Sequence, residues 1–237
     1  MDAVFVHMVE NYYITGQCNW VDKEELNKIT ERAKAISPNL IGRFAPEFSD
    51  YYGRPFMRDL KNKLFSLKDI SAEYTVLFFY GPTSGYCNEI APKLKNTINK
   101  IRYQGVDIKT FAVSTEFSKN DWSSFINKHG LSDWINVSDI NHDDEGNPVA
   151  SSDWRDKYDI YSTPVIYLLD QKKQIIAKRI TVDQLRKIIA RKNDISVKDI
   201  LNKCIGDCYN GYGTYTAEEG RYNGYWKDGK VHGKGIF

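Results

Sequence analysis

Apolar and polar residues alternate with two different periods along the chain, and these periods predict where helices and strands lie. Residues 2 to about 40 carry apolar side chains at helical spacing, which predicts two helices. The second helix is expected to begin after Asp22, because Glu25 three residues later completes a capping-box pattern. The pair Ser37-Pro38 is expected to end it.

From Gly42 onward, short apolar strands alternate with amphipathic stretches, a pattern typical of a sheet covered by helices. The clearest buried strand is 75–80. The turn sequence Gly81-Pro82-Thr83-Ser84-Gly85 ends this strand, and residues 87–103 then have the spacing of an amphipathic helix. A second strand over 106–113 and a helix over 118–129 complete a βαβα unit.

Two later apolar runs, 165–169 and 174–180, are separated only by Asp170-Gln171-Lys172-Lys173, which predicts an antiparallel hairpin. Residues 181–192 then predict another helix. Because the earlier strands are joined through a helix and these two through a turn, we expect a mixed sheet flanked by helices, and an α/β fold class.

Beyond about Asn202 the composition shifts to Gly, Tyr and Trp. Gly211, Gly213 and Tyr215 recur 22 residues later as Gly233, Gly235 and Phe237, which indicates a β-hairpin repeat segment that breaks off at the end of the chain. We therefore divide the chain into a helical N-terminal extension (1–41), an α/β domain (42–192), and a linker helix with a truncated repeat segment (193–237).

Composition removes several classes of partner. Lysine and arginine number 33 against 31 acidic residues, and the net charge of +2 gives no electrostatic basis for binding nucleic acid or an anionic membrane. The mean hydropathy is −0.53, and no apolar run approaches the roughly 18 residues that a transmembrane helix needs. The first eight residues lack the pattern of an export signal, so any leader is absent from this chain.

The residues with a chemical role stand at the turn between the first strand and its helix. Cys87 is expected in the first turn of that helix, where free backbone N–H groups and the helix dipole favour a thiolate. A two-thiol catalyst needs the spacing C-x-x-C, because the first sulfur attacks a disulfide and the second resolves the intermediate. Here Ser84 holds the first position, and a hydroxyl has no disulfide-exchange chemistry.

The segment Phe79 to Cys87, with Pro92 beyond it, resembles the active-site turn and helix of thioredoxin-fold proteins. Residues 161–165 (Tyr-Ser-Thr-Pro-Val) resemble the segment that carries that family's cis-proline. Residues 42–48 resemble the opening of periplasmic thiol-disulfide oxidoreductases of cytochrome maturation and of alkyl hydroperoxide reductase and thiol-specific antioxidant (AhpC/TSA) proteins. The resemblance covers residues 42–192 and implies a thioredoxin-like mixed sheet.

This resemblance implies a thiol-disulfide oxidoreductase that acts on protein thiols or disulfides in the periplasm or another extracytoplasmic compartment, without a cofactor. It places Ser84 in the nucleophile position and Cys87 in the resolving position of the catalytic pair. The substrate-binding positions that it implies are Gly85, Tyr86, Thr163 and Pro164. With Ser84 present, we expect no net disulfide turnover by this chain.

Two other functions stay open. The first is a non-catalytic module that uses the thioredoxin groove to hold a protein. The second is a one-cysteine peroxidase, since Ser84-x-x-Cys87 fits the Thr/Ser-x-x-Cys of peroxiredoxins, although that family's proline is expected where Tyr80 stands. Whether Ser84 is natural or engineered is also open.

The tail closely resembles membrane occupation and recognition nexus (MORN) repeats over residues 210–215 and 222–235, which implies stacked β-hairpins. Cross-strand pairing is the favoured role of its tyrosines and Trp226, and binding of a protein or a membrane surface is the lesser alternative. Cys204 and Cys208 could close a small disulfide in an oxidising compartment, but packing is the favoured role. We expect no metal site, because the four histidines are scattered without a second ligand at metal-binding spacing: His7, His129, His142 and His232.

Overall fold

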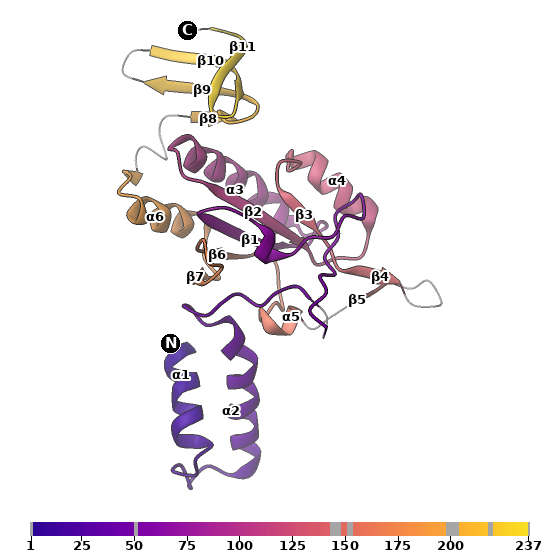
Figure 1. Cartoon of the computed structure of the whole chain (residues 1–237), viewed down its shortest axis with the longest axis vertical. Coiled ribbons are helices and arrows are strands. Elements are labelled where there is room, and N and C mark those ends of the chain that lie inside the picture. The colour runs from indigo at the N-terminus through magenta and orange to yellow at the C-terminus, as the bar shows by residue number, and fades with distance from the viewer. Residues whose placement is uncertain are drawn as a thin grey trace.

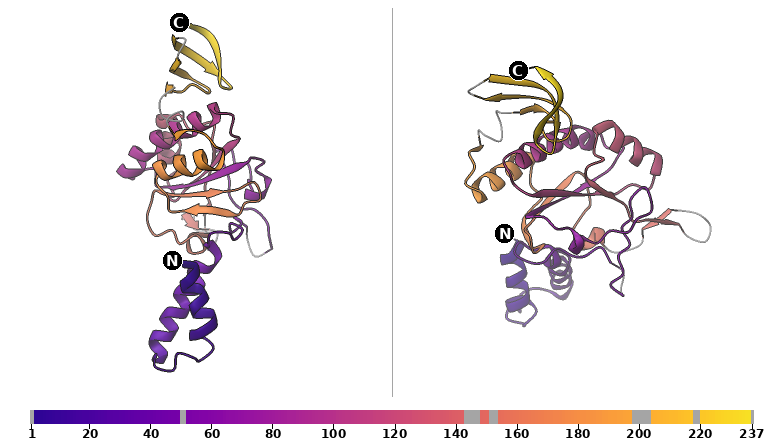
Figure 2. Two further views of the ribbon diagram at one scale, coloured as in Figure 1. Left: turned by 90° about the vertical axis from the view of Figure 1, so that its left-hand side faces the viewer. Right: turned by 45° about the horizontal axis from the view of Figure 1, so that its top comes forward.

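Three parts follow one another along the chain, which the computed structural model describes over residues 2–49, 52–142, 148–150, 154–197, 204–217 and 220–236. A pair of helices comes first, an α/β domain follows, and a small β-sheet comes last (Figure 1). The helical pair and the small sheet lie on opposite sides of the α/β domain, as both views of Figure 2 confirm. Within these described ranges, no helix is long and apolar enough to cross a membrane.

The central sheet is mixed, as the sequence predicts. Its five strands have the spatial order β3-β2-β1-β6-β7. Strand β1 pairs in parallel with β2 and antiparallel with β6, and β6 forms the expected antiparallel hairpin with β7. The strands are β1 (Tyr74–Tyr80), β2 (Ile108–Ser114), β3 (Ile135–Val137), β6 (Val165–Leu169) and β7 (Ile175–Lys178).

Helices cover both faces of this sheet, so every residue of the central strand β1 is buried. The domain's helices are α3 (Gly85–Tyr103), α4 (Lys119–His129), α5 (Trp154–Lys157) and α6 (Val182–Lys192), with a short 3-10 turn, η3 (Leu67–Asp69). On one face Phe78 packs with Leu94 of α3 and Ile189 of α6. On the other face Phe79 packs with Phe48 and with Tyr158, which follows α5.

Two elements of the domain had no clear signal in the sequence. Strand β3 has only three residues, and α5 has four, so neither is long enough to display a period. A further two-stranded antiparallel ribbon joins β4 (Ile140–His142) to β5 (Pro148–Ala150).

The N-terminal extension forms the predicted pair of helices. The first consists of α1 (Asp2–Met8) continued by a π-helical turn, η1 (Val9–Tyr13), and the second is α2 (Lys23–Ile36) followed by a 3-10 turn, η2 (Ser37–Asn39). The Asp22 carboxylate accepts a hydrogen bond from the Glu25 N–H at 2.9 Å and so begins α2 where the sequence predicts. Val9 and Ile36 are buried where the two helices meet.

The tail forms a four-stranded antiparallel sheet with the order β11-β10-β9-β8, in accord with the expected hairpins. Its strands are β8 (Cys204–Gly206), β9 (Tyr212–Ala217), β10 (Gly220–Lys227) and β11 (Lys230–Ile236). Two of the repeat's glycines have no room for a side chain: a Cβ on Gly213 would lie 2.8 Å from the Cys208 sulfur, and one on Gly235 would overlap the Tyr222 ring. The repeat position Phe237 lies outside the described residues.

One interpretation of the tail needs correction. The sequence favours packing as the role of its two cysteines, whereas the structure joins Cys204 and Cys208 in a disulfide. Strand β8 and the turn that follows it bring the two residues together, with their Cα atoms 6.1 Å apart. Both cysteines are also buried against Trp226, and the sheet packs on α3 through Tyr103 and Tyr215, whose rings lie 4.9 Å apart.

Candidate active site

The turn between β1 and α3 brings Ser84 and Cys87 together. Ser84 is the N-cap of α3, with extended backbone angles, and its Oγ accepts a hydrogen bond from the backbone N–H of Cys87 at 3.3 Å. Serine is a preferred residue at an N-cap because its oxygen satisfies one of the free N–H groups of the first turn. The predicted sequence of strand, turn and helix is therefore present, and positions 84 and 87 lie on the same turn of α3.

Cys87 is shielded from solvent. Its exposed fraction is 0%, and it packs in the main core with Tyr80, Ala91 and Ile166. Ser84 is half-buried, and Tyr86 is 60% exposed on the outer side of the same turn. An approaching molecule would therefore meet position 84 and Tyr86 before it could reach the sulfur of Cys87.

The buried phenol of Tyr80 borders this sulfur. Burial raises the pKa of Tyr80 well above its ordinary value of 10, and a thiolate at Cys87 would raise that pKa further. The Tyr80 hydroxyl accepts a hydrogen bond from Trp122 Nε1 at 2.9 Å. Tyr80 thus stays a neutral phenol in the physiological range and cannot serve as a base toward Cys87.

The second predicted segment lies beside this turn. The peptide bond between Thr163 and Pro164 is cis, as the resemblance implies, and Pro164 leads directly into β6. Pro164 and Tyr86 line one groove of about 220 Å³. Its other lining residues are Ile90, Ser162, Val165, Ile166, Arg179, Ile180, Thr181 and Val182. The start of α3 and the cis-proline segment, 78 positions apart in sequence, thus form the two sides of one groove.

Glu116 stabilises the turn through hydrogen bonds to Thr83, a role that the sequence did not predict. Its carboxylate accepts hydrogen bonds from the Thr83 N–H at 3.1 Å and from the Thr83 hydroxyl at 2.9 Å. A Cβ on Gly81 would overlap the Glu116 carboxylate and lie 3.3 Å from Thr163 Oγ1. The turn can therefore approach both Glu116 and Thr163 only because residue 81 has no side chain.

A second brace comes from α4. The Asn88 amide donates to the carbonyl of Pro82 at 3.2 Å and to that of Ser84 at 3.0 Å. The Asn88 Oδ1 accepts from Lys128 Nζ at 2.9 Å and lies 3.0 Å from His129 Nε2. Partial burial, together with the charge of Lys128, lowers the pKa of His129, so the neutral ring donates from Nε2 to the amide oxygen. This network fixes the backbone of the turn to α4.

Other candidate sites lie away from this groove. A larger cavity, of about 650 Å³, is bounded by the α/β domain and the small sheet, with Arg102, Asp133 and Asp228 in its wall, and none of the predicted site residues lines it. A search of the described part of the chain finds no cluster of three or more side chains that could hold a metal ion. Cys18 is a partly exposed free thiol in the loop between the N-terminal helices.

Comparisons with known proteins agree with this geometry. The AhpC/TSA family model matches residues 41–193. A domain of a possible thiol-disulfide isomerase from Cytophaga hutchinsonii is 31% identical, covering 67% of this chain and 96% of that structure, with a TM-score of 0.53. None of the curated proteins gives a significant match.

Two more distant structures show the fold alone. A thioredoxin-like protein from Bacteroides caccae is 18% identical, with a TM-score of 0.62. The aligned region covers 81% of this chain and 62% of that structure. The thioredoxin domain of a thiol-disulfide oxidoreductase from Bacteroides vulgatus is 23% identical, with a TM-score of 0.50. The aligned region covers 63% of this chain and 98% of that structure. The expected thioredoxin-like fold is confirmed.

Proposed function

The chain belongs to the AhpC/TSA family, and we propose that it binds the cysteine-containing segments of other proteins as a thiol-disulfide oxidoreductase whose nucleophile position holds Ser84. The observation that carries this proposal is the groove lined by Tyr86 and Pro164, together with the buried Cys87, which belongs to the same core cluster as the groove residue Ile166. An extended substrate segment would lie in this groove, with Tyr86 on one side and Pro164 on the other. The two other predicted binding residues, Gly85 and Thr163, are sequence neighbours of these two but do not themselves line the groove.

The chemistry of the complete family pair explains why position 84 decides the activity. A thiolate there would attack a substrate disulfide, form a mixed disulfide and release one substrate thiolate. The thiolate of Cys87 would then attack the mixed disulfide, release the second substrate thiolate and leave a bond between the two motif sulfurs. The substrate gains two electrons, and the motif pair loses them. The Ser84 hydroxyl cannot begin this sequence, so the unaltered chain binds substrate without turnover.

The direct test is to supply the missing thiol. We expect the unaltered chain to leave insulin reduction by dithiothreitol at the background rate and the Ser84→Cys variant to accelerate it. Ser84→Ala serves as the matched control, since it changes the same position without adding a sulfur. Activity of the unaltered chain, or no activity after Ser84→Cys in a folded variant, would count against the proposal.

The structure also supports a non-catalytic binding module as the second candidate. The Ser84 hydroxyl caps α3, so a serine in the nucleophile position keeps the turn folded and leaves the groove intact. Under this alternative, Ser84→Cys would still bind substrate segments but would not reduce insulin. Insulin reduction, measured for the unaltered chain and for Ser84→Cys, therefore distinguishes the two candidates.

We propose that the protein acts in the periplasm or another extracytoplasmic compartment. The Cys204–Cys208 disulfide supports this location, because disulfides persist in oxidising compartments and are rare in the cytosol. Alkylation and intact mass measurement on protein taken directly from its source would show whether the two cysteines are oxidised there.

We propose that the tail sheet is a MORN-like repeat segment that binds a protein or a membrane surface. Its strand β11 is exposed along its whole length, which leaves that edge of the sheet accessible.

A further inference from the structure

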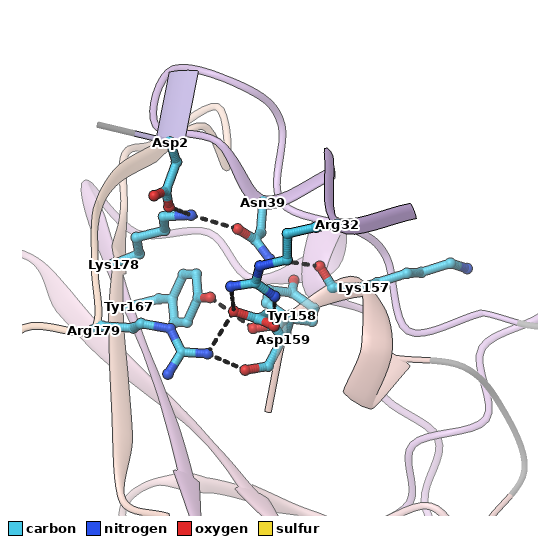
Figure 3. Close-up of polar contacts among 9 residues, drawn as sticks. All are labelled: Asp2, Arg32, Asn39, Lys157, Tyr158, Asp159, Tyr167, Lys178 and Arg179. Atoms are coloured by element: carbon cyan, nitrogen blue, oxygen red, sulfur yellow. Dashed lines mark hydrogen bonds and ion pairs between the residues drawn. The ribbon is translucent and has the colours of Figure 1, made fainter. Parts of the chain in front are cut away.

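Ion pairs through Asp159 connect Arg32 of the N-terminal helices to Arg179 (Figure 3), and Arg179 lines the candidate groove. At its centre is Asp159, which is only 6% exposed and lies just before the cis-proline segment. The Asp159 carboxylate accepts from Arg32 Nη1 at 2.9 Å and from Arg179 Nη2 at 2.9 Å. Arg32 belongs to α2, whereas Arg179 directly follows β7. One buried carboxylate therefore holds two guanidinium groups from separate parts of the chain.

Arg179 is the charged residue among those that line the groove beside Pro164, since the others there are apolar or carry a hydroxyl or phenol. Its backbone has a φ of 53°, in the left-handed region that side-chain-bearing residues seldom adopt. Two contacts hold it in place, because Nη2 donates both to the Asp159 carboxylate and to the Asp159 carbonyl oxygen. In Figure 3 its other terminal nitrogen points away from Asp159.

The charges in this cluster do not cancel. Lys178 is paired with Asp2 at 2.6 Å, and Asp159 neutralises only one of its two arginines. Asp183, an acidic side chain on the first turn of α6, is paired with Arg186 at 2.6 Å. Among the described ion pairs of this cluster, one positive charge is therefore left over beside the groove.

Arg32 accounts for that excess. Without it, Asp159 and Arg179 would form a simple neutral pair, and the groove would lose its net charge. The helical extension thus influences the charge of the groove through Arg32 of α2, although Arg32 does not itself line the groove.

We propose that Arg179 is a specificity-determining residue that favours protein segments with an acidic side chain next to the bound cysteine. Arg32 is the positioning residue, because it shares Asp159 and so leaves the charge of Arg179 uncompensated. A carboxylate in the groove would accept a charge-assisted hydrogen bond from the free end of the guanidinium. This inference rests on the proposed function, since it assumes that an extended protein segment occupies the groove.

Binding of short peptides to the unaltered chain tests the inference without requiring turnover. Three octapeptides carry serine in place of cysteine, an uncharged dye, and either Asp, Asn or Lys at the neighbouring position. Fluorescence anisotropy should show the Asp peptide binding about two- to fivefold more tightly than the Asn peptide at low salt, with the Lys peptide weakest. The difference should largely disappear at about 0.5 M salt, because the pair is partly exposed.

Four variants separate charge from structure. Arg179→Gln should abolish the preference, so that the Asp and Asn peptides bind with equal affinity. Arg32→Gln should reduce the preference, and Arg32→Lys, which keeps the charge, should restore it. Lys34→Gln is the matched control, since Lys34 lies on the same helix but pairs with Glu31 at 2.9 Å and should have no effect.

Equal binding of the Asp and Asn peptides at low salt, including no measurable binding of either, would overturn the inference. So would a preference that survives Arg179→Gln, and a preference unchanged by Arg32→Gln would overturn the role of Arg32. The proposed function has a separate readout in insulin reduction by Ser84→Cys. Turnover without an acidic preference refutes only this inference, whereas an acidic preference without turnover refutes only the proposed activity.

Discussion

The Ser84 Oγ accepts a hydrogen bond from the backbone N–H of Cys87 at 3.3 Å, so the hydroxyl that replaces the expected nucleophile caps the helix that carries the remaining thiol. Serine suits this position structurally while it removes the disulfide-exchange chemistry. Structural and catalytic requirements at position 84 can therefore be measured separately.

The capping role predicts a loss of stability when the hydroxyl is removed. We expect Ser84→Ala to lower the free energy of unfolding by about 1 kcal/mol, because the Cys87 N–H loses its acceptor. Urea unfolding followed by circular dichroism measures the change. Ser118→Ala is a comparison at the N-cap of α4, where Ser118 Oγ accepts from the Asp121 N–H at 3.2 Å. A stability unchanged by Ser84→Ala would show that the bond contributes nothing.

The close approach of Gly81 and Glu116 predicts a coupled pair of substitutions. Gly81→Ala should destabilise the protein by about 1–3 kcal/mol, because the added methyl overlaps the Glu116 carboxylate. Glu116→Ala loses the two bonds to Thr83, but it also removes the overlapping group. The double variant should therefore be more stable than the sum of the two single effects predicts, in a double-mutant cycle by urea unfolding. Strict additivity would contradict this packing.

His129 predicts a pH dependence of stability with a defined direction. Partial burial and the neighbouring Lys128 lower its pKa in the folded protein below the ordinary value of 6.5, so the unfolded chain binds the proton more readily. The stability that the neutral ring contributes is fully present above about pH 6.5. It is lost as the pH falls from there through the lower folded pKa.

The measurement is a set of urea unfolding midpoints between pH 7.5 and about pH 5. We expect the decline toward low pH to be shallower in His129→Gln than in the unaltered chain. The effect is small, because the ring is only partly buried. An identical pH dependence of stability in the two proteins would show that His129 contributes nothing to the network around Asn88.

The burial of Cys87 predicts that its thiol reacts slowly with reagents in solution. Stopped-flow mixing with hydrogen peroxide should show Cys87 reacting no faster than free cysteine, whereas the partly exposed Cys18 should be labelled first by an aromatic disulfide reagent. The variant Cys18→Ser isolates the signal of Cys87. Rapid loss of the Cys87 thiol with peroxide would instead favour the one-cysteine peroxidase.

Local sequence signals predicted the elements that carry the site. Strand β1, the turn and helix α3 were evident because an apolar run, turn residues and helical spacing follow one another within about 30 positions. The cis bond at Pro164 followed from a family resemblance over a short segment. Both kinds of signal lie within a single stretch of chain.

The contacts that hold the site together had no such signal. Glu116 is 33 positions from Thr83, and Arg32 is 127 positions from Asp159, so only the folded chain brings each pair into contact. Neither residue belongs to a motif, and charged side chains of this kind are most often solvated. The sequence ranks the Cys204–Cys208 disulfide below packing, because spacing alone does not fix whether two cysteines are oxidised.

The most direct test of the account measures whether position 84 and Cys87 form a working redox pair. The Ser84→Cys variant, in a Cys18→Ser background, is equilibrated with glutathione buffers, alkylated and examined by peptide mass spectrometry. We expect a reversible disulfide between position 84 and Cys87, with a midpoint roughly between −270 and −120 mV, the range of thioredoxin-like oxidoreductases. A folded variant in which both thiols stay reduced across these buffers, or in which Cys87 never pairs with position 84, would contradict it.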